Sequence, residues 1–220
     1  MLAARAVVFF VLTTASLAAH GSGEWTLKKS TDDIRIYYRT TDDGYTEFRG
    51  VTRVRTSLSA LVALFYDVQS MPNWVHRILE ARKLEQIGAQ EAYAYIAIRM
   101  PWPFRNRDVL VHSTLEQDPR TLAVTIRGAN VGGRFPERSQ YVRVRKIRSH
   151  WAFSPQADGS VEVAFQGYGD AGGNLDSVLM RWAIDLVLWE SPLKTLQGLR
   201  QMIVAPEYQN SSLAFIREPD

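Results

Sequence analysis

The 220-residue sequence contains no cysteine. This absence excludes a disulfide framework, a thiolate nucleophile, zinc or iron–sulfur sites with cysteine ligands, and a lipidated cysteine anchor. An excess of one charge is also lacking, because 26 lysines and arginines against 23 aspartates and glutamates leave a formal net charge of +3. That balance gives no indication of nucleic-acid binding. With only 14 glycines and 9 prolines, collagen-like and low-complexity disordered chains are excluded as well.

Long apolar runs are missing too. The strongly apolar N-terminal stretch, residues 6–12, is shorter than the roughly 20 residues that a membrane-spanning helix needs. An arginine precedes it and small residues follow it, as in a secretory signal. We therefore interpret residues 1–19 as a signal peptide cleaved near Ala18 or Ala19, rather than as an uncleaved anchor. The mature protein is expected to be periplasmic or secreted.

The mature chain is dominated by β patterns. Runs rich in β-branched and aromatic residues, separated by turn-forming residues, predict nine antiparallel strands. They cover residues 25–30, 34–39, 45–55, 78–87, 91–99, 107–117, 121–127, 141–153 and 161–168. After the third strand, apolar residues from Leu58 to Phe65 recur at helical spacing, with Ser57 or Ser59 as the N-cap, and a short helical turn follows around Trp74.

The last periodic segment, residues 175–204, predicts a long helix. Its apolar sector is so wide that the helix must be covered on most of its circumference. Pro192 is expected to kink it, because proline removes a backbone donor and clashes with the preceding turn. Residues 205–220 are mostly polar and are expected to form a frayed tail.

This order of elements predicts one α+β domain over residues 24–204, in which a strongly curved antiparallel sheet wraps around the C-terminal helix. Periodicity alone is compatible both with a cavity between helix and sheet and with an ordinary filled core. No internal repeat or linker indicates a second domain.

One pattern suggests chemistry that the rest of the chain does not support. Residues 167–172 match the G-x-G-x-x-G dinucleotide pattern, with Glu190 about the right distance beyond. A nucleotide-binding unit needs a second parallel strand after its helix, and the chain ends too soon for one, so these glycines predict a sharp turn. Neither metal-ligand spacing among the histidines nor a G-x-S-x-G elbow occurs, and we expect no cofactor and no metal.

Four motifs carry a family resemblance: Trp74 after the helical pair, MPWPFRNRD at residues 100–108, GYGDAGG at residues 167–173 and SPLKTLQGLR at residues 191–200. They resemble the START lipid-transfer family of the helix-grip (SRPBCC) superfamily. The resemblance implies a tunnel under the C-terminal helix that holds one hydrophobic ligand, such as a sterol, a phospholipid or another lipid. It also implies that the loop at residues 100–106 gates the tunnel.

The resemblance and the strand pattern together indicate a set of ligand-binding candidates. They are Trp74, Tyr93, Tyr95, Trp102, Phe104, Arg107, Asp108, His112, Trp151, Gln166, Tyr168, Leu179, Trp182 and Leu186. For Arg107 and Asp108, a structural role in pinning the base of the loop is an equally open interpretation. The strand faces that line a cavity depend on register, since a slip of one residue exchanges every face.

A basic cluster has two interpretations. It consists of Arg134, Arg138, Arg143, Arg145, Lys146 and Arg148. It is either a solvated edge that discourages sheet-to-sheet pairing or a docking patch for anionic lipid headgroups.

We expect an exported, monomeric, non-enzymatic lipid carrier that makes transient membrane contact and does not bind nucleic acid. The superfamily also suggests an alternative, an aromatase/cyclase-like enzyme that uses the same cavity. A third interpretation is an interaction module with a filled core and no ligand.

Overall fold

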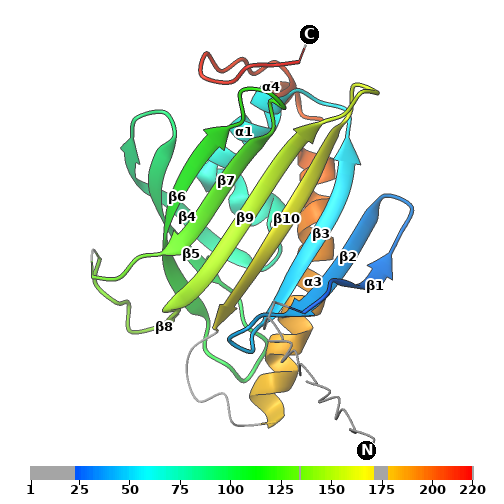
Figure 1. Cartoon of the computed structure of the whole chain (residues 1–220). Helices are drawn as coiled ribbons and strands as arrows, with labels where there is room; N and C mark the ends of the chain where they lie inside the picture. Colours follow the sequence, from blue (N-terminus) through cyan, green and yellow to red (C-terminus); the bar gives the residue numbers. More distant parts are fainter. Residues whose placement is uncertain (1–22, 134, 171–177, 220) are drawn as a thin grey trace, which may run out of the picture.

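The structure is a computed structural model that describes residues 23–133, 135–170 and 178–219, with the backbone alone for residues 170 and 178–189. Ten strands of the described residues form one curved sheet in the order β1-β2-β3-β10-β9-β7-β6-β5-β4, with β8 beside β6 (Figure 1). All pairings are antiparallel except that of β6 with β8. The strands are β1 (Thr26–Ser30), β2 (Ile34–Thr40), β3 (Thr46–Val54), β4 (Ile78–Ile87), β5 (Glu91–Ile98), β6 (Arg107–Gln117), β7 (Val124–Asn130), β8 (Val142–Arg143), β9 (Lys146–Pro155) and β10 (Val161–Asp170).

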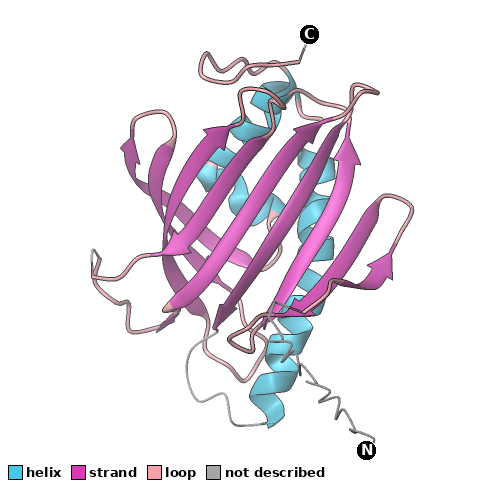
Figure 2. Ribbon diagram, in the orientation of Figure 1, coloured by secondary structure: helices cyan, strands magenta, loops and turns pink. Residues whose placement is uncertain are grey.

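The helices gather on the concave side of this sheet (Figure 2). They are α1 (Leu58–Tyr66), the 3-10 turn η1 (Val68–Ser70), α2 (Met71–Trp74), α3 (Val178–Met202) and α4 (Pro206–Gln209). The long helix α3 continues through Pro192 and packs against β3, β2 and α2. This arrangement confirms the predicted α+β fold, a curved antiparallel sheet around a C-terminal helix.

Alternation along the strands explains how the sheet faces its core. Ile34, Ile36 and Tyr38 of β2 are buried, while the intervening Arg35 and Tyr37 are more exposed.

The second half of α3 lies so close to its neighbours that glycine is needed at the contacts. A Cβ on Gly198 would lie 2.3 Å from the Trp74 carbonyl oxygen, and a Cβ on Gly50 would lie 2.7 Å from Leu196 Cδ1.

The predicted N-cap of α1 is confirmed and the bounds of two predicted strands are corrected. The Ser57 hydroxyl accepts a hydrogen bond from the Ala60 amide at 3.1 Å and caps α1. The seventh strand begins at Val124 rather than residue 121, because the Asp118 carboxylate accepts the amides of the two residues before Leu122 and holds a turn there. The expected strand at residues 141–153 is divided into β8 and β9.

The C-terminal segment corrects the expectation of a frayed tail. Tyr208 and Ile216 are buried in the main core. The Glu218 carboxylate accepts hydrogen bonds from the amides of Leu58 at 2.9 Å and Ser59 at 2.7 Å, which caps α1 from the far end of the chain. The segment lies beside α1 in Figure 1. Two buried side chains, Tyr208 and Ile216, are sufficient to hold a segment that is otherwise mostly polar. The polar composition of the segment therefore led to the wrong prediction.

Candidate functional site

An apolar cavity of about 300 Å³ lies on the concave side of the sheet, bordered also by α1, α2 and α3. Small and aliphatic residues of two adjacent strands form one wall: Ala92, Ala94, Ile96 and Ile98 of β5, with Val109, Val111 and Ser113 of β6. Phe48, Phe65, Met71, Trp74, Trp151 and Phe165 border it from other elements. Its volume falls at the lower end of the range typical of small-molecule sites.

Aromatic rings form the opposite wall. Trp151 stacks on Phe165 with ring centroids 4.0 Å apart, and Trp74 meets Trp151 edge-on at 5.8 Å. Gly167 allows this crowding, since a Cβ there would lie 3.2 Å from the Phe48 ring. The cavity thus combines small residues on β5 with fixed rings on β9 and β10.

One end of the cavity is polar. Arg107 is only 3% exposed, and burial, followed by the charge of Arg105, lowers its pKa. Thr195 of α3 borders the same end and accepts a hydrogen bond from the His76 amide at 3.1 Å. Burial also lowers the pKa of the His76 imidazole, and the positive charges of Lys194 and Arg77 lower it further.

A single carboxylate links α3 to the turn before β4. Glu190 lies 3.4 Å from an Arg77 nitrogen, 3.4 Å from Lys194 Nζ and 3.6 Å from His76 Nε2. Arg77 itself has a φ of 66°, in the left-handed region that a non-glycine residue rarely adopts. The turn is therefore held in an unusual conformation directly beside the cavity.

Four of the predicted ligand-binding residues border the cavity: Trp74, Arg107, Trp151 and Tyr168. The predicted placement of five others is corrected, because Tyr93, Tyr95, Asp108, His112 and Gln166 lie on the opposite face of the sheet. The cause is alternation: Ala92, Ala94 and Ile96 of β5 face inward, so Tyr93 and Tyr95 between them face outward.

On that outer face the five residues have structural partners. His112 stacks on Tyr93 with ring centroids 4.6 Å apart and lies 2.7 Å from the Glu91 carboxylate. The Gln166 amide donates to Glu47 at 2.7 Å. These contacts tie neighbouring strands together.

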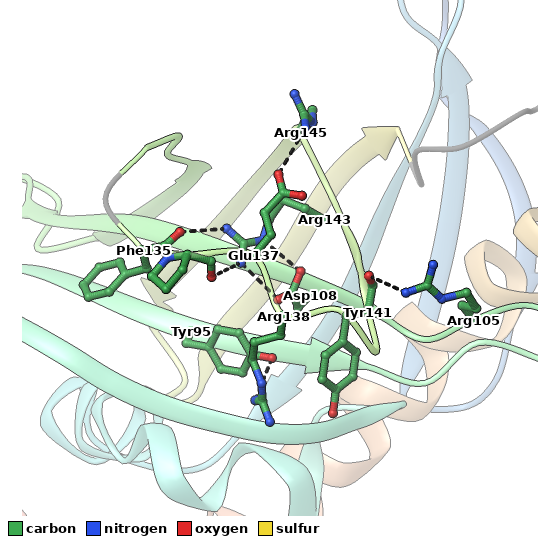
Figure 3. Close-up of polar contacts among 10 residues, drawn as sticks. Tyr95, Arg105, Asp108, Phe135, Glu137, Arg138, Tyr141, Arg143 and Arg145 are labelled. Atoms are coloured by element: carbon green, nitrogen blue, oxygen red, sulfur yellow. Dashed lines mark hydrogen bonds and ion pairs between the residues drawn. The ribbon is translucent and has the colours of Figure 1, made fainter.

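A strap, defined here as residues 135–143, covers part of the outer face (Figure 3). Asp108, 1% exposed, accepts two hydrogen bonds from Arg143, at 2.8 and 3.1 Å. Arg138 donates to the Tyr95 hydroxyl at 2.9 Å. With Phe135 and Tyr141 packed against Tyr95, the geometry favours the structural interpretation of Asp108.

The loop at residues 100–106 is fastened to the same strap. The Arg105 guanidinium donates to the carbonyl oxygens of Ser139 and Tyr141, and the Val142 amide donates to that of Asn106 at 3.0 Å. Trp102 is 89% exposed and borders no part of the cavity, nor does the half-buried Phe104. The three remaining candidates, Leu179, Trp182 and Leu186, lie outside the residues whose side chains the structure describes.

Ion pairs occupy most of the basic cluster. Arg143 pairs with Asp108, Arg138 with Glu80 at 2.9 Å, Arg145 with Glu137 at 3.1 Å and Lys146 with Asp43 at 2.6 Å. Arg134 lies outside the described residues. The structure therefore supports an outer surface that is cross-linked by ion pairs more than a docking patch of unpaired cations.

A second hollow, of about 840 Å³, opens on the outer face and is lined by polar residues of β2, β3, β6, β7, β9 and β10. Two of its three carboxylates are paired, Glu47 with Arg39 at 2.7 Å and Asp43 with Lys146, and the third is Asp42. Within the described ranges there is no group of three metal-ligating side chains. No described helix is long and apolar enough to cross a membrane.

Sequence reasoning missed several cavity residues, notably Phe65, Met71, His76, Phe165 and Thr195. The alternation of alanine with tyrosine in β5 was the available signal. Small residues make room on the face that borders a cavity, whereas the larger tyrosines drew attention to the wrong face.

Comparison with known proteins finds one matching family and several similar chains. The START domain family matches residues 13–201. An uncharacterized protein of Pseudomonas aeruginosa, PA1579, is 32% identical over 195 residues, which cover 86% of this chain and 93% of that protein. Mouse phosphatidylcholine transfer protein is 25% identical over 130 residues, covering 58% of this chain and 60% of that protein.

Among solved structures, the STAR-related lipid transfer protein fragment of Xanthomonas axonopodis superposes with a TM-score of 0.74 at 28% identity. The match covers 82% of this chain and 99% of that fragment. Human STARD10 superposes with a TM-score of 0.66 at 15% identity, over 81% of this chain and 74% of that structure, a likeness of fold alone.

Proposed function

Because the chain belongs to the START domain family, we propose that it binds one lipid in the apolar cavity and carries it through an aqueous compartment. The observation that carries this proposal is the cavity itself, walled by aliphatic strand faces and stacked aromatic rings. We further propose that the protein is exported by its N-terminal signal segment and acts as a monomer.

The mechanism is burial. Moving apolar surface out of water is favoured by about 25 cal/mol per Å², so an acyl chain or a sterol gains several kcal/mol on entering such a site. Binding also stabilises the cavity walls, because the ligand gives the lining atoms dispersion contacts that they otherwise lack. Transfer needs no chemical step, and we propose a carrier rather than a cyclase-like enzyme.

The test is native mass spectrometry of protein purified without detergent from the compartment to which it is exported, followed by organic extraction and identification of any added mass. One lipid per protein supports the proposal and names the ligand class. A bare protein that also fails to take up offered sterols, phospholipids or fatty acids would overturn it.

We also propose that the loop at residues 100–106 makes the membrane contact. Trp102 is 89% exposed at its tip, the exposed Arg99 directly precedes the loop, and the exposed Arg105 lies within it. Tryptophan partitions to the headgroup level of a bilayer, and nearby cations add attraction to anionic lipids.

Replacing Trp102 with alanine should lower binding to vesicles that contain anionic lipid about tenfold, measured by co-sedimentation. Val204 provides a matched control, since it is an exposed apolar residue, 69% exposed, on another part of the surface. Equal losses for Trp102→Ala and Val204→Ala, or no loss for either, would remove this loop from the proposal.

A further inference from the structure

From a buried donor beside the cavity we infer that the ligand carries an uncharged oxygen acceptor, which accepts a hydrogen bond from the indole N–H of Trp74. The inference rests on the proposed lipid-binding function and specifies the chemical class of the ligand. It goes beyond that function because an apolar cavity alone favours a hydrocarbon over the same molecule with an added oxygen.

The donor is the indole nitrogen of Trp74. This residue borders the cavity from the end of α2 and is only 3% exposed. Its Nε1 atom is buried and has no hydrogen-bond partner among the described residues. An indole N–H only donates, and buried donors in native proteins nearly always have an acceptor. An oxygen that the ligand brings into the cavity supplies the acceptor for this N–H.

The surroundings of Trp74 fix the direction of this donor. Its ring meets Trp151 edge-on with centroids 5.8 Å apart, and Trp151 in turn stacks on Phe165 at 4.0 Å. Its backbone lies against α3, where a Cβ on Gly198 would lie 2.3 Å from the Trp74 carbonyl oxygen. A donor held in this way loses little side-chain freedom on binding, which favours an acceptor at one defined place.

Other polar groups along the cavity wall have partners within the protein. The Ser113 hydroxyl donates to a β5 carbonyl oxygen at 3.3 Å, and the Thr195 hydroxyl accepts the His76 amide at 3.1 Å. The His76 ring nitrogen Nε2 lies 3.6 Å from the Glu190 carboxylate, and its side chain is 23% exposed. Compared with these groups, Trp74 is the more deeply buried donor and the one without an acceptor.

The apolar body of the ligand has a defined place beside this donor. Five small residues lie side by side across β5, β6, β7, β9 and β10, and all border the cavity: Ala92, Ser113, Gly128, Ser149 and Gly167. This row spans four strand spacings, about 19 Å. Trp151, which Trp74 contacts, follows Ser149 by two residues on the same face of β9. An elongated body therefore lies along the row with its oxygen at Trp74.

The experiment compares probes that differ by one oxygen. Wild-type protein is titrated with heptadecane and heptadecan-2-one, and with cholestane and cholestan-3-one, all delivered from cyclodextrin. Binding is measured by displacement of a fluorescent lipid. In at least one pair the ketone should bind about tenfold more tightly than the hydrocarbon. Without a donor the order would be reversed, because burial of a carbonyl oxygen without a hydrogen bond is unfavourable.

The indole resonance of Trp74 tests the contact directly in the wild-type protein. Addition of the preferred ketone should move its N–H proton downfield in a ¹H–¹⁵N spectrum, whereas the matching hydrocarbon should not. The sequence has six tryptophans, so the other indoles serve as internal references. A ketone that binds while the Trp74 N–H stays in place would overturn the inference.

Variants separate the donor from the row. Trp74→Phe keeps an aromatic ring but removes the N–H, so ketone affinity should fall about tenfold while hydrocarbon affinity does not fall. The matched control is Trp25→Phe, which should keep the ketone preference because Trp25 packs against Arg39, at 4.5 Å, and does not border the cavity. Ser149→Val narrows the row and should weaken both members of a pair equally. A larger loss of ketone affinity in Ser149→Val than in Trp74→Phe would assign the oxygen to Ser149 and overturn the assignment to Trp74.

Failure of the inference is distinguishable from failure of the proposed function. A protein that takes up sterols, phospholipids or fatty acids, but shows no ketone preference within either pair, overturns the inference and leaves lipid binding intact. A protein that takes up neither those lipids nor any of the four probes overturns both.

Discussion

At the scale of single residues, the pair formed by Asp108 and Arg143 shows how a family-like motif can serve structure. Arginine and aspartate follow each other at the start of β6, yet alternation sends Arg107 toward the cavity and Asp108 to the outer face. The bidentate contact fixes the strap, and through it the loop that carries Trp102.

Asp108→Asn should destabilise the protein by about 3–5 kcal/mol, because it leaves the Arg143 cation, 9% exposed, without its counter-charge. Urea unfolding measures the change. The control is Glu137→Gln, which removes the solvent-exposed partner of Arg145 and should leave the unfolding midpoint where it is. A similar midpoint for both variants would mean that the buried pair contributes little.

Ala94 tests the cavity at the same scale. Ala94→Leu places three additional carbons in the cavity, so it should prevent lipid uptake while the protein without lipid keeps its stability. Ala129→Leu, on an exposed outward position of β7, should retain uptake. Native mass spectrometry and thermal unfolding report the two quantities. Uptake by Ala94→Leu at the wild-type level would place the ligand elsewhere.

At the scale of elements, the C-terminal segment acts as part of α1. Glu218 accepts the first amides of that helix, and the Tyr208 hydroxyl donates to Asp67 at 2.9 Å just beyond its end. Tyr66 of α1 borders the cavity and stacks on Phe215 with ring centroids 6.2 Å apart. The segment therefore supports one wall of the site from outside.

Glu218→Ala should cost about 1 kcal/mol, as loss of an N-cap does, and should speed hydrogen exchange at the amides of Leu58 and Ser59. The matched control is Glu207→Ala in the exposed first turn of α4. Exchange that stays slow at both amides in Glu218→Ala would show that Ser57 alone caps the helix.

The elements themselves were largely predictable, whereas their faces were not. Residues 78–87 and 107–117 were predicted with the observed bounds because β-branched runs between turn residues leave few alternatives. Tyr95 was assigned to the wrong face because a strap distant in sequence buries it on the outside. The local sequence pattern shows the two-residue period of a strand, but it does not show which segments cover each face of the sheet.

At the scale of the whole molecule, two half-buried histidines, His76 and His150, connect the fold to pH. Burial lowers the pKa of His76 and of His150, each further depressed by nearby cations, Lys194 and Arg77 for the first and Arg127 and Arg49 for the second. In the unfolded chain both titrate near pH 6.5. Between that pH and the lower folded pKa values, the unfolded state binds more protons than the native state.

Stability should therefore be fully present above about pH 7 and fall as the pH drops through 6.5, with the loss levelling off below the folded pKa values. His76→Gln and His150→Gln should each flatten this decline in urea-unfolding free energy between about pH 7 and 5. Since His76 borders the cavity and His150 does not, only His76→Gln should also change the pH dependence of lipid release. If the slope is unchanged in both variants, the loss of stability in acid is due to the carboxylates instead. The pKa values of Asp43, Asp118 and Asp158 are lowered, so these groups titrate at more acidic pH.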